Sequence, residues 1–151
     1  MEQRMKNPAA YIEGSVEALQ SIAAMPHGHG VPDATLELVH LRASQINGCA
    51  WCLEYGHRLA KKAGETDERL STVAAWREAP YFDDAERAAL ALAESITRIA
   101  DTSDAVPDHI WEEAAKHYDE EGLAALVMHV AMTNVWNRLN VSVRQVAGTW
   151  A

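Results

Sequence analysis

Apolar residues recur every three or four positions through most of the chain, which is the spacing of one face of an α-helix. The first stripe of this kind consists of Ile12, Val16, Leu19 and Ala23. Asn7 and Pro8 precede the stripe as an N-cap and a first-turn proline, and Pro26 follows it. The pattern therefore predicts a first helix from about Asn7 to Met25.

The next two predicted helices meet at Asn47-Gly48. The second helix opens at Val31-Pro32-Asp33, and its stripe is Leu36, Val39, Ala43 and Ile46. Leu38 and Leu41 flank that stripe, so we expect this helix to be buried on more than one side. The third helix ends at Gly64, and its stripe is Cys49, Cys52, Gly56, Leu59 and Ala63.

Four more helices are predicted from the same spacing. Pro80 interrupts the pattern, and Asp83 with Glu86 three residues later is typical of a capping box. The approximate limits are Asp67 to Ala79, Asp83 to Ala100, Val106 to Tyr118 and Glu121 to Leu139, with a trailing segment over 141–150. No stretch alternates as a strand does. We therefore predict an all-α, single-domain bundle of about seven helices spanning residues 1–151.

Composition and charge narrow the classes of function. The 151 residues are 48% hydrophobic and 23% charged, which is typical of one globular domain. Thirteen basic and 22 acidic residues give a net charge of −9, which argues against nucleic-acid and anionic-membrane partners. The N-terminal MEQRMKN has no apolar segment, and the apolar run from Leu123 to Met132 is too short to span a bilayer. We expect a cytoplasmic protein.

Cys49 and Cys52 are the only cysteines, and they form a CxxC motif at the start of the third predicted helix. A helix N-terminus favours the thiolate, and the short spacing permits a disulfide, so the pair is suited to redox cycling. Structural zinc would need two more ligands, for example from Glu37, His40 or His57, and no second CxxC is present. Two inert buried thiols are the third interpretation.

The residues around this motif resemble a known family. The sequence LRASQINGCAWC over 41–52, with Glu37 twelve residues before Cys49, is similar to the alkylhydroperoxidase D-like, carboxymuconolactone decarboxylase family, and NVWNRLN over 134–140 resembles its last helix. The resemblance implies an all-helical fold, a homo-oligomer (trimer or hexamer), and peroxidase or disulfide-reductase chemistry. We expect no cofactor and no metal. The resemblance makes Cys52 the peroxidatic thiol, Cys49 the resolving thiol and Glu37 the acid that begins a proton relay.

One position departs from the family pattern. The family places a histidine four residues after the second cysteine, where this chain has Gly56, and the histidine is His57. A residue at i+4 lies about 40° from Cys52 around the helix, whereas one at i+5 lies about 140° away. A π-bulge near Gly56 would restore His57, His40 would replace it from the preceding helix, or the relay is absent and turnover is slow.

The leading hypothesis is a thiol-dependent hydroperoxide reductase that acts on organic hydroperoxides and is restored by a dithiol reductant protein. A non-enzymatic redox sensor or partner-binding oligomer is the alternative from another class. A lactone decarboxylase is the alternative within the family, although such members generally lack the cysteine pair.

Other polar residues receive structural interpretations. Asn134 and Asn137 on an apolar helix predict buried amide hydrogen bonds, within the chain or across a subunit interface. His129 has no partner that its spacing identifies, and we interpret it as structural or solvated. His27 lies in a glycine-rich loop and is expected to be solvated.

Overall fold

The computed structural model describes residues 2–149, and within that range it contains helices and no strand. The elements in chain order are η1 (Pro8–Tyr11), α1 (Ser15–Ala24), α2 (Asp33–Asn47), α3 (Ala50–Lys62), α4 (Asp67–Thr72), η2 (Val73–Ala75), α5 (Asp84–Thr97), α6 (Asp108–Ala115) and α7 (Glu120–Val143), where η denotes a 3₁₀ helix. The all-α prediction is confirmed.

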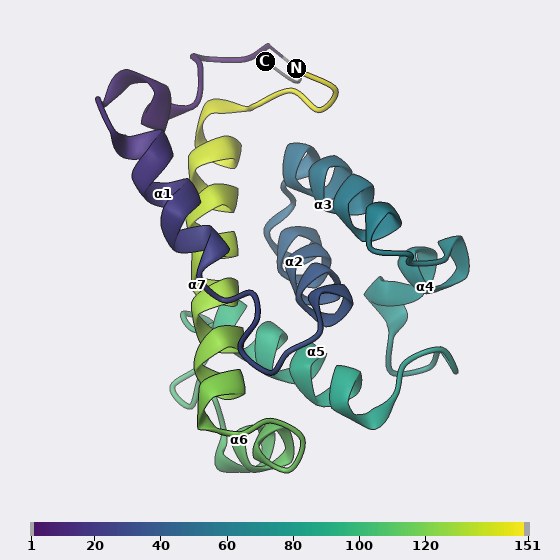
Figure 1. The fold of residues 1–151 in the computed structure, drawn as a ribbon. Helices are drawn as coiled ribbons and strands as arrows, with labels where there is room; N and C mark the ends of the chain where they lie inside the picture. Colours follow the sequence, from purple (N-terminus) through teal and green to yellow (C-terminus); the bar gives the residue numbers. More distant parts are fainter. Residues whose placement is uncertain (1, 150–151) are drawn as a thin grey trace.

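Helix α2 occupies the middle of the molecule, with α3, α5 and α7 packed around it (Figure 1). Leu36, Leu38 and Val39 are completely buried, although they point in different directions around the helix. Leu36 and Val39 belong to a core shared with α5, α6 and α7, and Leu38 belongs to a second core shared with α3, α4 and η2. The predicted burial of this helix on more than one side is therefore confirmed, and Glu37 on it is buried.

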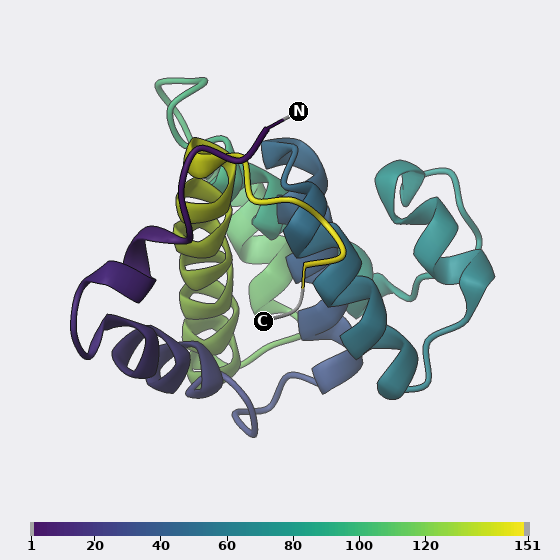
Figure 2. The ribbon, with the colours of Figure 1, turned by 90° about the horizontal axis from the view of Figure 1, so that it is seen from above.

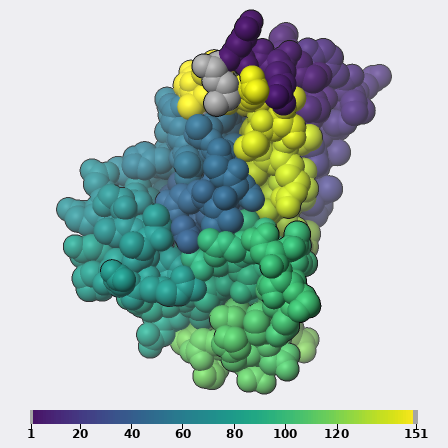
Figure 3. Space-filling model, turned by 180° about the vertical axis from the view of Figure 1, so that it is seen from behind, coloured from purple at the N-terminus to yellow at the C-terminus, as the bar shows by residue number. Residues whose placement is uncertain are grey.

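The N-terminal segment runs along the end of α7, and the segment that follows α7 passes over α3 (Figure 2). The backbone N–H of Arg4 donates to the carbonyl of Val143 at 3.0 Å, which attaches the N-terminal segment to the end of α7. On the face opposite to that of Figure 1, the C-terminal part of α7 lies between the N-terminal segment and the region of α2 and α3 (Figure 3). This arrangement places residues from both ends of the chain near the start of α3.

The first predicted helix is divided in two. Asn7 caps η1 as predicted, because its Oδ1 accepts the Ala9 N–H at 2.9 Å. The turn ends at Tyr11, because Ile12 has an extended backbone (φ −108°), and Gly14 with a left-handed conformation (φ 77°) is the N-cap of α1, which begins at Ser15. The prediction of one continuous helix from Asn7 was wrong because it ignored this glycine.

Other boundaries also differ from the prediction. The predicted fourth helix is shorter than expected. Its α-helical part, α4, ends at Thr72, and the 3₁₀ turn η2 that follows ends at Ala75, before the predicted limit of Ala79. The capping box of Asp83 and Glu86 is confirmed at the start of α5. Helix α7 continues to Val143 instead of ending at Leu139, so it includes the start of the predicted trailing segment. Residues 144–149 follow the helix, and Trp150 lies outside the described residues. None of the helices in the described range has the length and apolar character that a membrane span requires.

Candidate functional site

The two cysteines lie at the junction of α2 and α3. Gly48 ends α2 with a left-handed backbone (φ 67°), and Cys49 follows as the N-cap of α3. Cys49 and Cys52 are joined by a disulfide, with their Cα atoms 5.3 Å apart. The Sγ atom of Cys49 accepts the backbone N–H of Cys52 at 3.3 Å. Both cysteines are buried, and each is only 1% exposed.

A cavity of about 970 Å³ lies beside the disulfide and is lined by Cys52 but not by Cys49. Its wall is predominantly apolar, and its larger side chains are Trp51, Tyr55, Leu59, Met132 and Trp136. Trp51 and Tyr55 are stacked, with ring centroids 5.2 Å apart. Of the two cysteines, Cys52 is therefore the one that a small molecule in this cavity can approach.

Glu37 and His40 bring ionisable groups from α2 to the same cavity. Burial raises the pKa of Glu37 to about 7, although the nearby His27 opposes this effect. His40 donates from Nε2 to the carbonyl oxygen of Cys52 at 3.1 Å, and burial lowers its pKa, so the imidazole is neutral. Its Nδ1 lies 3.4 Å from the hydroxyl of Thr133 on α7.

The structure does not bring His57 to this site. Helix α3 is a regular α-helix from Ala50 to Lys62, with no π-bulge to rotate His57 toward Cys52. The side chain of His57 is exposed and does not line the cavity. Gly56 instead faces His40, and a Cβ atom built on this glycine would lie 2.5 Å from Cδ2 of that ring.

His129 belongs to the site, although the sequence interpretation gave it no partner. It is 8% exposed and lines the cavity, with its ring centroid 6.4 Å from that of His40 and 5.9 Å from that of His27. The pKa of His129 is lowered to about 3, chiefly by burial and also by the neighbouring His40 and His27. His27 also lines the cavity, and it lies in an exposed turn after α1 as predicted, with its side chain 38% exposed.

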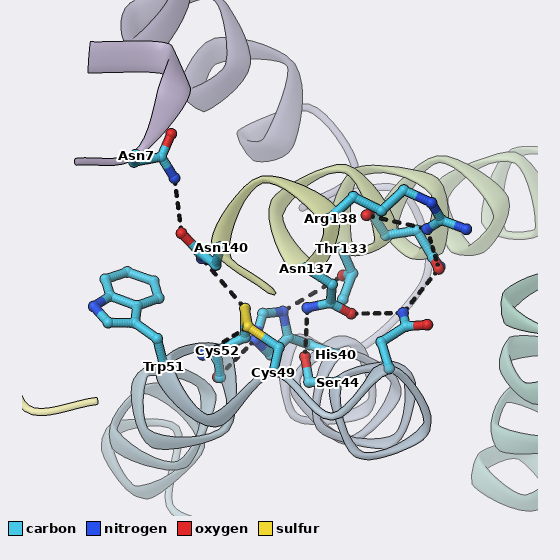
Figure 4. Close-up of a disulfide and its surroundings, with 12 residues drawn as sticks. Asn7, His40, Ser44, Cys49, Trp51, Cys52, Thr133, Asn137, Arg138 and Asn140 are labelled. Carbon is cyan, nitrogen blue, oxygen red and sulfur yellow. Dashed lines mark hydrogen bonds between the residues drawn. A yellow bond between two sulfur atoms is a disulfide. The ribbon is translucent and has the colours of Figure 1, made fainter. Parts of the chain in front are cut away.

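Asparagines of α7 connect this helix to the cysteine motif (Figure 4). Asn47 donates from Nδ2 to Asn134 at 2.9 Å and to Asn137 at 2.8 Å, so the predicted buried amide hydrogen bonds form within one chain. Asn140 donates from Nδ2 to the sulfur of Cys52 at 3.4 Å, and Asn7 donates to the Oδ1 of Asn140 at 2.7 Å. Sequence reasoning assigned no role to Asn140 or to this use of Asn7.

The arrangement of the possible ligands bears on the zinc interpretation of the cysteine pair. Across residues 2–149 there is no group of three or more His, Cys, Asp or Glu side chains arranged to hold a metal ion. The two sulfurs that would supply thiolate ligands are bonded to each other.

These features define a class of all-helical proteins with a CxxC disulfide at a helix N-terminus beside an apolar cavity. The chain belongs to the carboxymuconolactone decarboxylase family, because the model of that family matches residues 14–95. The uncharacterized protein YdfG of Bacillus subtilis (strain 168) is 41% identical over 108 residues, which are 72% of this chain and 72% of YdfG. The uncharacterized protein YnjA of Escherichia coli (strain K12) is 33% identical over 104 residues, which are 68% of this chain and 55% of YnjA.

Solved structures share the fold. A protein of unknown function from Agrobacterium tumefaciens, provisionally described as the antioxidant defence protein AhpD, has a TM-score of 0.89 at 27% identity and covers 99% of this chain and 100% of its own. The debrominase Bmp8 has a TM-score of 0.81 at 19% identity and covers 93% of this chain and 75% of its own. The expected alkylhydroperoxidase D-like fold is confirmed.

Proposed function

We propose that this protein reduces organic hydroperoxides, with Cys52 as the attacking thiol and Cys49 as the resolving thiol. The observation that carries this proposal is that Cys52, Glu37 and His40 line one cavity while Cys49 does not. A substrate in the cavity therefore meets one sulfur of the pair together with two groups able to move protons. The second sulfur is already at bonding distance, so it can complete the reaction without a large movement.

The reaction balances with two electrons supplied by the cysteines. The Cys52 thiolate attacks one oxygen of the O–O bond, which breaks, so that Cys52 becomes a sulfenic acid and the other oxygen leaves as an alkoxide. The alkoxide takes up a proton and becomes the alcohol. Cys49 then attacks the sulfur of the sulfenic acid, water leaves, and the Cys49–Cys52 disulfide forms. A dithiol reductant restores both thiols and is itself oxidised to a disulfide.

Glu37 and His40 are the proposed proton relay. A carboxyl group with a pKa of about 7 can accept the thiol proton and return it near neutral pH. A neutral imidazole can accept a proton at one nitrogen and release one from the other, and His40 already contacts Cys52 through its carbonyl oxygen. We assign the role of the family histidine to His40 and not to the exposed His57.

The size and lining of the cavity support an organic substrate. A volume of about 970 Å³ is far larger than hydrogen peroxide needs, and most of the surface area of the wall is apolar. The reductant has to use the same entrance, because both sulfurs are shielded from the surface. The dithiol of the proposed reductant protein must therefore reach Cys52 through the cavity.

A homo-oligomer, trimeric or hexameric, is part of this proposal. In the single chain no residue of α1 is buried, and Ile22 of α1 is exposed together with Ile12, which precedes this helix. Exposed apolar side chains on neighbouring segments are consistent with a subunit contact. Light scattering of the purified protein measures the number of subunits, and a monomer would exclude the oligomer.

Single-turnover oxidation tests the catalytic proposal. Fully reduced, metal-free protein is mixed with one equivalent of cumene hydroperoxide, and free thiols are counted while the products are mapped by mass spectrometry. We expect two thiols per chain to disappear and a Cys49–Cys52 disulfide to form. Cys49→Ser should stop at a sulfenic acid on Cys52, and Cys52→Ser should consume no peroxide. Thiols that survive in the wild-type protein would refute the peroxidase.

Steady-state turnover separates the enzyme from the redox sensor. With excess hydroperoxide and a small dithiol, an enzyme consumes many equivalents of peroxide per chain. A sensor is oxidised rapidly but is re-reduced too slowly to sustain consumption. The dithiol alone, without protein, provides the background rate.

A further inference from the structure

A directed chain of hydrogen bonds runs from the N-terminal segment to the sulfur of Cys52. The backbone N–H of Ala9 donates to Oδ1 of Asn7 at 2.9 Å, and Nδ2 of Asn7 donates to Oδ1 of Asn140 at 2.7 Å. Nδ2 of Asn140 then donates to Sγ of Cys52 at 3.4 Å (Figure 4). Two side-chain amides thus connect a backbone donor to the sulfur that lines the cavity.

The orientation of both amides follows from the first donor in this chain. A backbone N–H can only donate, so the atom of Asn7 that faces Ala9 must be the oxygen. The nitrogen of Asn7 consequently faces Asn140 and requires an oxygen there. That leaves the NH₂ group of Asn140 facing Cys52, and the amide cannot turn over without breaking its bond to Asn7.

We propose that Asn140 is a catalytic residue that stabilises the thiolate of Cys52, and that Asn7 is the positioning residue that keeps its NH₂ group directed at the sulfur. The proposal rests on the proposed function in one respect, namely that Cys52 is the attacking thiol. A hydrogen bond to an anionic acceptor is about twice as strong as one between neutral groups, so this donor favours the thiolate over the thiol. Asn140 is only 3% exposed, so little water competes with the sulfur for its NH₂ group.

The two cysteines differ in where their donors come from. Cys49 is the N-cap, and its sulfur accepts the Cys52 N–H from the first turn of α3. That helix donor is therefore already engaged by Cys49. Cys52 relies on a side chain of α7, and it does so on the wall of the cavity. The N-terminal segment thereby becomes part of the site, although Asn7 and Asn140 lie 133 positions apart in the sequence.

Thiol alkylation tests this proposal without peroxide. The background variant is Cys49→Ser, because serine preserves an N-cap and leaves Cys52 as the single thiol. The rate of Cys52 alkylation by iodoacetamide is measured from acidic to alkaline pH. We expect Asn140→Leu to slow alkylation at neutral pH about tenfold and to move the midpoint of the profile to higher pH, since a hydrogen bond to a charge contributes about that factor.

Asn7→Asp tests whether Asn7 positions the amide of Asn140. The new side chain has the same shape as asparagine, so we expect the protein to fold. Aspartate keeps the oxygen that caps Ala9 but replaces the Nδ2 donor by an oxygen. Asn140 is therefore expected to turn its NH₂ group toward the new carboxylate and its oxygen toward Cys52. A residue that only caps η1 would tolerate this change. We expect Asn7→Asp to slow alkylation about as much as Asn140→Leu, again about tenfold.

Arg4→Ala is the matched control, because Arg4 ties the same segment to α7 through the Ser142 carbonyl at 3.1 Å and does not contact Cys52. We expect this variant to alkylate at the rate of the background. If Asn140→Leu is alkylated as fast as the Cys49→Ser background, the proposal is overturned. If Asn7→Asp is alkylated as fast as that background, the positioning role of Asn7 is overturned. An equal slowing in Arg4→Ala overturns both roles, because it would show that only the attachment of the segment matters. Alkylation needs no peroxide turnover, so failure of the peroxidase assay would leave this result readable.

Discussion

The imidazole of His40 occupies the space into which a side chain at Gly56 would project. A Cβ atom on Gly56 would lie 2.5 Å from Cδ2 and 2.9 Å from Nε2 of His40, which is closer than such atoms can approach. Gly56 stands where the family pattern has a histidine four residues after the second cysteine. Glycine at position 56 of α3 therefore leaves space for the imidazole of His40 on α2. Only one of these two positions can carry an imidazole at this place in the fold.

Gly56→Ala should destabilise the protein by about 1–3 kcal/mol, because the new methyl group overlaps the ring of His40. The free energy of unfolding is measured by urea titration. In the His40→Ala background the ring is absent, so most of the cost of Gly56→Ala should vanish and leave only a close contact with Leu41. A cost that is equal in both backgrounds would show that the two residues do not compete for space.

Moving the imidazole between the helices should preserve part of its function. We expect His40→Ala to slow oxidation of Cys52 by about 10²-fold, which is the usual contribution of an acid–base group. Gly56→His added to His40→Ala should restore part of the rate, because a residue at i+4 reaches Cys52 on the helix surface. Rates are measured as thiol loss after addition of one equivalent of hydroperoxide.

His57→Ala provides the control for this exchange. His57 is exposed and lies away from the cavity, so its removal should leave the rate of oxidation unchanged. A large loss of rate in His57→Ala, with none in His40→Ala, would return the relay to the histidine adjacent in sequence to the family position.

Helices were predictable here wherever the apolar stripe was long and its ends carried turn residues. The stripe from Leu36 to Ile46, the Asn47-Gly48 break and the capping box at Asp83 all define elements that the structure contains. The errors have local causes. Gly14 interrupts a stripe whose apolar spacing continues across it, and the fourth helix changes to 3₁₀ geometry at Val73, where apolar spacing does not distinguish the two forms.

The cysteine motif and Glu37 could be identified because they match a family pattern, and His40 could be proposed because it lies one turn from Glu37 on the same helix. His129 and Asn140 could not, because spacing along α7 reports which face they share and not which helix covers that face. Asn7 is still further from such reasoning, since its partner lies at the other end of the chain. The structure therefore added the residues that long-range packing brings to the sulfur.

Glu37→Gln removes a group that ionises near pH 7, and this should change the pH dependence of both the activity and the stability. We expect the variant to lose about 10²-fold in the rate of Cys52 oxidation and to lose the limb of the pH–rate profile near pH 7, because glutamine cannot take up the thiol proton. The matched control is Glu54→Gln on α3, whose carboxylate pairs with Arg58 away from the cavity.

The same variant should alter stability with a definite sign. The pKa of Glu37 is raised from 4.5 to about 7 on folding, so the folded state favours the protonated carboxyl. That stabilisation is complete below pH 4.5 and is lost as the pH rises through about 7, with a total of about 3 kcal/mol. Glu37→Gln should show no such loss. If the wild-type protein and Glu37→Gln keep parallel stability curves between pH 4.5 and 8, the carboxyl is not buried as the structure shows.

His129 should make the protein sensitive to acid. Its pKa falls from 6.5 to about 3 on folding, so folding favours the neutral ring, and this contribution is present above pH 6.5 and is lost as the pH falls through about 3. The full difference corresponds to about 4–5 kcal/mol. Burial of His40 lowers its pKa as well and acts in the same direction.

His129→Leu separates this ring from the other acid-sensitive groups. Nε2 of His129 has no hydrogen-bond partner within residues 2–149, so an apolar side chain of similar size should cost little at pH 7. Urea unfolding between pH 7 and pH 4 should then show a shallower loss of stability in His129→Leu than in the wild-type protein. The exposed His109→Leu should follow the wild-type curve. An unchanged slope in His129→Leu would mean that groups other than His129 carry the acid sensitivity of the fold.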